Sequence, residues 1–193
     1  MGNTYLCVDQ YLDNIDQSGI VLEIGSYRHE GSTEFFARIA NIKNMEFHSV
    51  DIDVAYAQRR VNDQSIVWHQ AAGSQWCKTV LPNLNKKISL LYLDNFDYEW
   101  DIYEHNDWIL QQKQQYRDSF DMEMNNNNCQ IEHATQMLLC LPYMSPQSVI
   151  VFDDTYQYND CWIGKNGPAV VWLQAMGWQL KLYKDYGVIL SNH

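Results

Sequence analysis

The stretch GIVLEIGSYRHEGST, residues 19–33, decides the fold of this chain. Its first part, residues 20–24, is a short apolar run that predicts a buried strand. Gly25 follows and allows the backbone to turn sharply. Beyond the turn, apolar residues recur at helical spacing, and these residues are Phe35, Phe36, Ile39 and Ala40. The stretch therefore predicts a strand, a glycine turn and a helix, in that order.

The start of this helix and the end of the next strand together predict a binding site. Residues 31–33, Gly-Ser-Thr, lie where the first turn of the helix points its free N–H groups at a ligand. A second strand, residues 46–51, ends in the carboxylate of Asp51, which suits ribose hydroxyls in a nucleotide-binding β-α-β unit. Five residues separate the two glycines, so the G-x-G-x-x-G pattern of dinucleotide-binding proteins is absent. The alternative is a generic α/β turn with solvated acidic residues.

Length and composition narrow the class of protein. A chain of 193 residues suits one domain with a sizeable core, so we expect a single domain over residues 1–193. The net charge of −11 disfavours nonspecific binding to nucleic acid. The five cysteines form no C-x-x-C pair, which argues against a disulfide scaffold or a zinc site and favours a reducing, cytoplasmic location. No apolar run is long enough to span a bilayer, so we expect no membrane partner.

Acidic residues follow two later strands. Residues 88–93 and 148–152 are near-continuous apolar runs, as expected for parallel strands that are covered on both faces. The first run ends at Asp94 and the second at Asp153 and Asp154. Ligands of doubly wound sheets bind beyond the carboxyl ends of the strands, so Asp51 and Asp94 are expected to face the same crevice.

Residues 99–130 interrupt the alternation of strands and helices. The segment is rich in Asn, Gln and aromatic residues, and connections of this length in a compact domain are usually functional. We predict a partly helical lid over residues 100–120 and a mobile tip over residues 121–130. The alternative is that the insertion packs against a second copy of the chain in a homo-oligomer.

Three motifs resemble those of class I S-adenosylmethionine-dependent methyltransferases. They are Glu23-x-Gly25-Ser26, Gly31-Ser32-Thr33 and Val50-Asp51-Ile52-Asp53. The resemblance implies an α/β fold with a doubly wound, seven-stranded, mostly parallel sheet and an antiparallel last strand, and S-adenosylmethionine as cofactor. The cofactor-binding residues that it implies are Glu23, Gly25, Ser26, Gly31, Ser32, Thr33, Asp51, Ile52, Ala71, Ala72 and Asp94.

The acidic strand ends resemble a narrower group, the metal-dependent O-methyltransferases of the macrocin type. In that group an acidic residue after one strand and an Asp-Asp pair after the next bind a divalent cation. Asp94, Asp153 and Asp154 match the pattern, which implies a site for Mg²⁺ or another divalent cation. Such a cation lowers the pKa of a substrate hydroxyl and fixes its direction. The alternative is that the Asp-Asp pair only caps a turn.

The general base is less clearly marked. The macrocin pattern places a carboxylate two residues after the first metal ligand, where this chain has Phe96, and Asp97 follows one residue later. The predicted catalytic residues are Asp94, Asp97 and His133. We expect a methyltransferase that transfers a methyl group to the hydroxyl of a small-molecule acceptor. The alternative is a cofactor-binding domain of the same fold with another role, for example in protein interaction.

Overall fold

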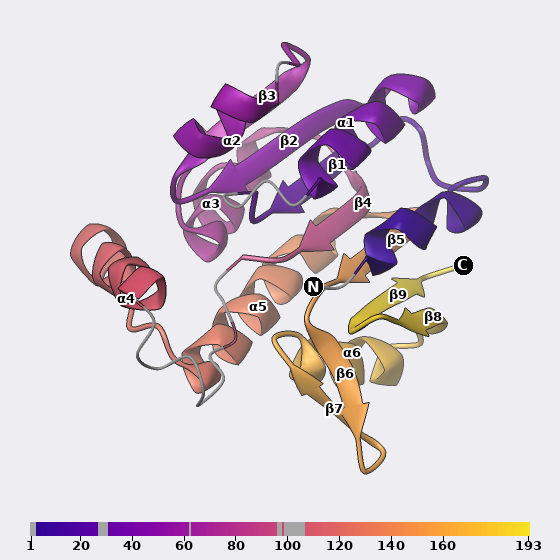
Figure 1. Cartoon of the computed structure of the whole chain (residues 1–193). Coiled ribbons are helices and arrows are strands. Elements are labelled where there is room, and N and C mark those ends of the chain that lie inside the picture. Colours follow the sequence, from indigo (N-terminus) through magenta and orange to yellow (C-terminus); the bar gives the residue numbers. More distant parts are fainter. Residues whose placement is uncertain (1–2, 27–30, 62, 96–97, 99–106) are drawn as a thin grey trace.

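The computed structural model describes residues 3–26, 31–61, 63–95, 98 and 107–193. Its centre is a seven-stranded sheet in the order β3-β2-β1-β4-β5-β9-β8, in which β9 runs antiparallel to both of its neighbours (Figure 1). The strands are β1 (Ile20–Ile24), β2 (Glu46–Asp51), β3 (Ile66–Gln70), β4 (Ile88–Leu93), β5 (Met144–Phe152), β8 (Gln179–Lys184) and β9 (Gly187–Ser191). The predicted fold class is confirmed.

Helices cover both faces of this sheet. The 3₁₀ helix η1 and helix α1 lie on one face, whereas α3, α5 and α6 lie on the other. The helical elements are η1 (Thr4–Tyr11), α1 (Ser32–Lys43), α2 (Val54–Arg60), α3 (Gly73–Thr79), η2 (Leu81–Asn83), α4 (Asp107–Phe120), α5 (Asn126–Cys140), η4 (Leu141–Tyr143) and α6 (Gly167–Ala175). None of the helices in the described part of the chain is both long and apolar enough to cross a membrane.

The apolar side chains of each strand alternate between two cores. In β1, Ile20, Leu22 and Ile24 pack with α3, α5 and α6, whereas Val21 packs with α1 and η1. This alternation follows from the strand period of two residues and explains why apolar residues face both sides of the central parallel strands. The strands are in register, with Ile24 opposite both Val50 and Leu93, so the carboxyl ends of β1, β2 and β4 form one edge.

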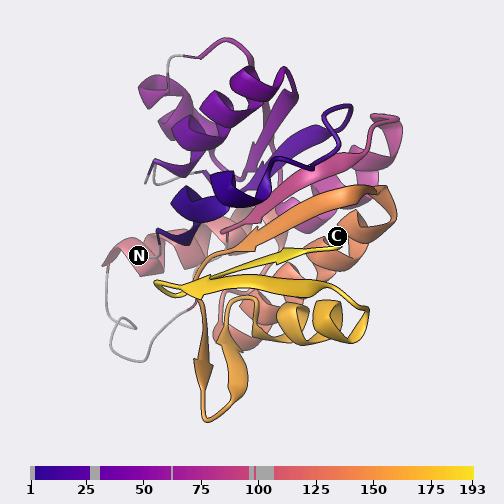
Figure 2. The ribbon, with the colours of Figure 1, turned by 90° about the vertical axis from the view of Figure 1, so that its right-hand side faces the viewer.

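A second, two-stranded sheet was not expected. It is the antiparallel hairpin of β6 (Thr155–Tyr158) and β7 (Cys161–Gly164), which starts directly after the Asp153-Asp154 pair. The hairpin projects away from the main sheet in both ribbon views (Figures 1 and 2). It returns the chain to the carboxyl end of β5, and therefore places residue 165 next to residue 154.

The prediction of a mobile tip over residues 121–130 was wrong. Helix α5 begins at Asn126, because the side chain of Asn125 caps it by accepting a hydrogen bond from the backbone N–H of Asn128 at 2.9 Å. Met124 and Cys129 are fully buried in a small cluster with Ile52. The helix predicted within residues 100–120 is confirmed by α4, whereas its role as a lid stays a prediction, and residues 99–106 lie outside the described part of the chain.

Candidate active site

Gly25 forms the turn at the carboxyl end of β1. Its φ is +107°, in the left-handed region, and a Cβ atom there would overlap the backbone of Asp94 and Asn95 at the end of β4. Only glycine satisfies both requirements. The turn therefore brings two strand ends into direct contact. The hydroxyl of Ser26 and the side-chain carbonyl of Asn95 are buried beside it without a hydrogen-bond partner among the described residues.

Glu23 is fully buried in β1 and holds α1 and β2 against the strand. One carboxylate oxygen accepts a hydrogen bond from Ser32 Oγ, and the other accepts from Thr33 Oγ1 and Ser49 Oγ, each at 2.8 Å. Burial raises the pKa of Glu23 to about 7, although the three hydroxyl donors oppose the shift. Ser32 and Thr33 thus turn their side chains toward Glu23, and only their backbone N–H groups suit a cofactor.

Asp51 lies at the carboxyl end of β2, beside the glycine turn. Its Oδ2 accepts a hydrogen bond from the backbone N–H of Ser26 at 2.7 Å, and its Oδ1 accepts from the N–H of Asp53 at 2.9 Å. These two bonds fix the direction of the carboxylate. Asp51 therefore lies at the predicted ribose position, and its binding role stays a prediction.

Ala71 and Ala72, which the resemblance to methyltransferases assigns to the adenine ring of the cofactor, lie further along the same edge. Ala72 precedes α3 and lines a cavity of about 860 Å³ between α3, α4 and α5, whereas Ala71 is half-buried and packs on the core. Ile52 is buried against Tyr116 of α4. Helix α4 thus packs directly beside the predicted cofactor-binding strand ends.

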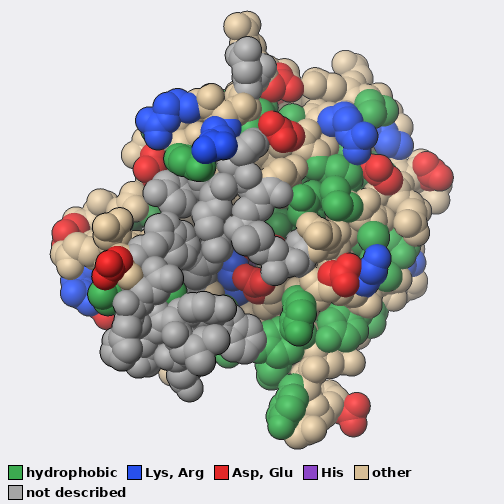
Figure 3. Space-filling view, in the orientation of Figure 1, with side chains coloured by type: hydrophobic (Ala, Val, Ile, Leu, Met, Phe, Trp, Pro, Cys, Tyr) green, Lys and Arg blue, Asp and Glu red, His purple; other side chains and the backbone are tan. Residues whose placement is uncertain are grey.

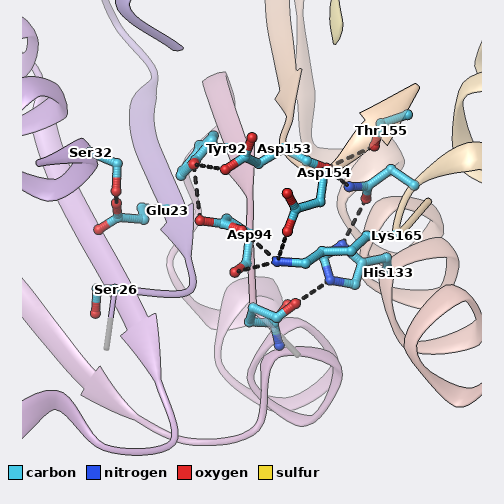
Figure 4. A network of polar contacts seen from close by, with 12 residues as sticks. Glu23, Ser26, Ser32, Tyr92, Asp94, His133, Asp153, Asp154, Thr155 and Lys165 are labelled. Atoms are coloured by element: carbon cyan, nitrogen blue, oxygen red, sulfur yellow. Dashed lines mark hydrogen bonds and ion pairs between the residues drawn. The ribbon is translucent and has the colours of Figure 1, made fainter. Parts of the chain in front are cut away.

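The three predicted metal ligands converge, and we call them with Tyr92 and Lys165 the acidic centre (Figure 4). The hydroxyl of Tyr92 lies 3.1 Å from Asp94 Oδ2 and 3.3 Å from Asp153 Oδ2, and so bridges the ends of β4 and β5. Burial raises the pKa of Asp153 to about 8, and the charges of Asp94 and Asp154 add to this effect. Asp153 therefore retains its proton at neutral pH.

Lys165 supplies the positive charge of the acidic centre. Its side chain is fully buried, and its Nζ lies 2.7 Å from Asp94 Oδ1 and 2.9 Å from Asp154 Oδ2. Figure 4 shows the ammonium between these two carboxylates. The sequence analysis gave Lys165 no role in the site.

The β6–β7 hairpin positions Lys165. Gly164 has a φ of +87°, and a Cβ atom there would overlap the carbonyl oxygen of Asp154. The backbone N–H of Lys165 donates to that carbonyl at 2.9 Å. Asn166 donates from Nδ2 to the carbonyl oxygen of Asp153 at 3.0 Å. The segment that carries the lysine is therefore attached to the backbone of the Asp-Asp pair.

His133 is fully buried on α5 and braces the same segment. Its Nδ1 lies 2.7 Å from Asn166 Oδ1, and its Nε2 hydrogen-bonds to the carbonyl oxygen of Asn95. Burial and the charge of Lys165 lower the pKa of His133. With both ring nitrogens engaged inside the fold, His133 in this arrangement has no nitrogen available to take a proton from an acceptor. Asp97, the other predicted base, lies outside the described residues.

A divalent cation does not fit the acidic centre as the side chains are arranged. A Mg²⁺ ion binds carboxylate oxygens at about 2.0–2.1 Å. An ion shared by Asp94 Oδ1 and Asp154 Oδ2 would occupy nearly the position of the Lys165 ammonium, which contacts the same two oxygens. The two cations would repel each other. No group of three or more His, Cys, Asp or Glu side chains in the described part of the chain is arranged to hold a metal ion.

The fold of this chain is that of the class I methyltransferases, as comparison with solved structures shows. No family model matches the sequence, and no curated protein sequence matches it either. CalS11, a TDP-rhamnose 3'-O-methyltransferase of calicheamicin biosynthesis, is similar with a TM-score of 0.60 and 16% identity, over 97% of this chain and 78% of that chain.

Two other similar structures differ in what they act on. MycE, a methyltransferase of the mycinamycin pathway solved in complex with Mg and SAH, has a TM-score of 0.57 and 12% identity, over 96% of this chain and 48% of that chain. A protein of Plasmodium falciparum described as a ribosomal RNA methyltransferase has a TM-score of 0.53 and 11% identity, over 97% and 92% of the two chains. The shared fold therefore does not identify the molecule that receives the methyl group.

Proposed function

We propose that this protein is an S-adenosylmethionine-dependent methyltransferase that acts on a hydroxyl group of a small molecule. The observation that carries the proposal is the turn at Gly25, which is pressed against the end of β4 with Asp51 on one side and Asp94 on the other. Such a turn between carboxylates, at the carboxyl edge of a parallel sheet, suits a nucleoside with a charged amino-acid tail.

Buried polar atoms beside the turn support the cofactor part of the proposal. Ser26 Oγ and Asn95 Oδ1 have no partner among the described residues, and buried polar groups in folded proteins are almost always hydrogen-bonded. A bound cofactor would supply the missing partners. The N-terminus of α1, which no side chain caps, offers further N–H donors on the same side of the turn.

The chemistry requires little beyond positioning. S-adenosylmethionine supplies an electrophilic methyl group whose sulfur is already a good leaving group. The chain must hold the acceptor oxygen in line with that methyl group, and positioning of this kind can contribute roughly 7–11 kcal/mol. The hydroxyl proton must pass to a base as the oxygen–carbon bond forms. The carboxylates of the acidic centre and the predicted base Asp97 are the candidates on this side of the fold.

A small-molecule acceptor agrees with the surface beside the acidic centre. Hydrophobic side chains gather over the β6–β7 hairpin in Figure 3, and the exposed aromatic residues there include Tyr158 and Tyr186. The ring of Tyr186 also contacts Tyr156 at 5.4 Å between centroids. Flat apolar rings of this kind suit a ring-shaped acceptor. The strongly acidic chain does not suit nucleic acid.

Helix α4 and the residues before it are proposed as the lid over the acceptor. Tyr116 of α4 contacts the cluster that contains Ile52, so movement of the helix would open the side of the predicted adenine site. A homo-oligomer through residues 99–130 and a cytoplasmic location also stay predictions. Metal assistance, which the sequence predicts, is not part of the proposal because Lys165 contacts the same carboxylate oxygens.

Calorimetry with S-adenosylmethionine and S-adenosylhomocysteine tests the proposal. We expect saturable binding of both, and Asp51→Ala should weaken it by more than tenfold, which is about 1.4 kcal/mol. Asp63→Ala removes a carboxylate that hydrogen-bonds to Ser65 and Asn41 and serves as the matched control. Undetectable binding to the wild type at millimolar cofactor would refute the proposal.

A second candidate function is a cofactor-binding domain without transferase activity. It is separated from the first by incubation with methyl-labelled S-adenosylmethionine and a panel of sugar and phenol acceptors. Binding by calorimetry together with a failure of every acceptor class to take up label would favour this second function.

A further inference from the structure

Lys165 is an unusual residue to find fully buried. Lysine is almost never completely inaccessible to solvent unless it is paired, because transfer of an ammonium group out of water is costly. Among the described residues, ion pairs to Asp94 and to Asp154, with distances of 2.7 and 2.9 Å, offset the cost. The two partners belong to different strand ends. The ammonium therefore links β4 to the segment after β5.

The surroundings of the ammonium are specifically arranged. Gly164 permits the close approach of the lysine segment to Asp154, and Asn166 attaches the same segment to Asp153. Gln130 of α5 donates to the carbonyl oxygen of Gly164 at 2.9 Å. Contacts from α5, β5 and β7 thus fix the position of one cationic side chain. A lysine that reached the carboxylates only by chance would not require this framework.

The ammonium stands where the sequence pattern predicts a metal. The carboxylates of Asp94 and Asp154 are predicted metal ligands, but Asp94 Oδ1 and Asp154 Oδ2 contact the Nζ atom of Lys165 instead. A divalent ion at these oxygens would lie almost on top of a group of like charge. Occupation of the position by the lysine and by a metal is therefore mutually exclusive.

We propose that the Lys165 ammonium is the resident cation of the acidic centre and takes the place of a divalent metal in holding Asp94 and Asp154 toward the acceptor. Lys165 is a positioning residue in this arrangement, since its side chain is buried and acts through the two carboxylates. The acceptor meets Asp154, whose side chain is 36% exposed, whereas that of Asp94 is 14% exposed. The inference rests on the proposed function for its reference to an acceptor, but its cation part does not.

The test is a titration of the folded protein with Mn²⁺, followed by electron paramagnetic resonance, and with Mg²⁺, followed by melting temperature. The wild type should bind no Mn²⁺ at micromolar concentration and should melt at the same temperature in Mg²⁺ and in chelator. Lys165→Ala vacates the position and should gain one Mn²⁺ site, with a melting temperature that rises in Mg²⁺. The double variant Lys165→Ala with Asp154→Asn should lose that gain.

Two further variants keep the outcome decisive. Lys165→Met removes the charge but fills the space, so its affinity for Mn²⁺ should be at least tenfold lower than that of Lys165→Ala. Lys184→Ala removes an exposed ion pair with Asp185 and should change nothing. One saturable Mn²⁺ site in the wild type that Asp153→Asn abolishes would overturn the inference, even if Lys165→Ala does not fold. The inference would also be overturned if Lys165→Ala folds and gains no Mn²⁺ site.

The failure of this inference is distinguishable from failure of the proposed function. Calorimetry with S-adenosylhomocysteine reports the cofactor site and does not depend on the cation. Wild-type protein that binds S-adenosylhomocysteine and one Mn²⁺ refutes the role of Lys165 and leaves the methyltransferase proposal intact. Protein that binds neither refutes the proposed function, and the gain of Mn²⁺ by Lys165→Ala still decides the cation.

Discussion

Two regions of this molecule bury carboxylates, and they satisfy them in different ways. Around Glu23, three uncharged hydroxyl groups donate hydrogen bonds to one carboxylate. In the acidic centre, Lys165 pairs with the carboxylates of Asp94 and Asp154, and the hydroxyl of Tyr92 contacts Asp94 and Asp153. The first region fixes the start of α1 rigidly to β1 and β2. The second keeps charges that a reaction can use, and among the described residues its positive charge comes from Lys165.

The largest effect is expected from removal of that cation. Lys165→Ala should lower the free energy of unfolding by about 3–5 kcal/mol, because loss of one partner leaves buried charge uncompensated. Urea unfolding in the presence of chelator measures this change. Lys184→Ala, which breaks an exposed pair, should change the free energy by less than about 0.5 kcal/mol. Equal effects in the two variants would contradict the importance of burial.

A pH-dependent effect is expected from Glu23. The pKa of Glu23 is about 7 in the fold against 4.5 for an ordinary glutamate, so the folded state binds an extra proton between these values. Stability linked to Glu23 is therefore fully present below pH 4.5 and is lost as the pH rises to about 7. The loss is about 3 kcal/mol, from roughly 1.4 kcal/mol per unit of pKa.

Comparison with a variant that is uncharged at residue 23 isolates the contribution of Glu23 to the pH dependence of stability. The free energy of unfolding of Glu23→Gln relative to the wild type should increase across the range from pH 4.5 to 7. Glu34→Gln lies on the exposed side of α1 and should show no such trend. A flat difference between Glu23→Gln and the wild type would mean that the hydroxyl donors hold Glu23 ionised, and the contrast between the two regions would then weaken.

A smaller effect is expected from His133, which connects α5 to Asn95 after β4 and to Asn166 beside Lys165. His133→Leu leaves the carbonyl oxygen of Asn95 buried without its donor, which should cost about 1–3 kcal/mol. Affinity for S-adenosylhomocysteine should stay within threefold of the wild type. Ile131→Ala, at an exposed position of α5, is the control. Unchanged stability combined with loss of methyl transfer would restore His133 as the general base.

The main sheet could be predicted from the sequence because its signals are local. Parallel strands that are buried on both faces are mostly apolar runs; Gly25 and Asp94 follow such runs directly, and Asp51 ends β2. Convergence of Asp94 with Asp153 follows from neighbouring strand ends alone. The helix start at Asn126 was missed because a run of asparagines suggests disorder, whereas here Asn125 acts as a cap.

Lys165 could not be assigned in the same way, since its place depends on the β6–β7 hairpin. A signal for that hairpin was present. Asn159 and Asp160 both have positive φ, which is the backbone of a two-residue type I′ turn, and aromatic and polar residues alternate in β6 before it. Asp185 and Tyr186 form the same kind of turn between β8 and β9. The direction in which residue 165 points required the structure.

The pairing of β6 with β7 determines whether the charge of Lys165 reaches the acidic centre. Thr155 lies opposite Gly164, and Tyr158 lies opposite Cys161. Asp154 precedes the first pair and Lys165 follows it, so this register places the two residues side by side. A slip of one residue in an antiparallel pair turns every side chain to the other face. A shift of the β6–β7 pairing by one residue would therefore direct the lysine away from the carboxylates, and the charge of the centre would change without substitution of any charged residue.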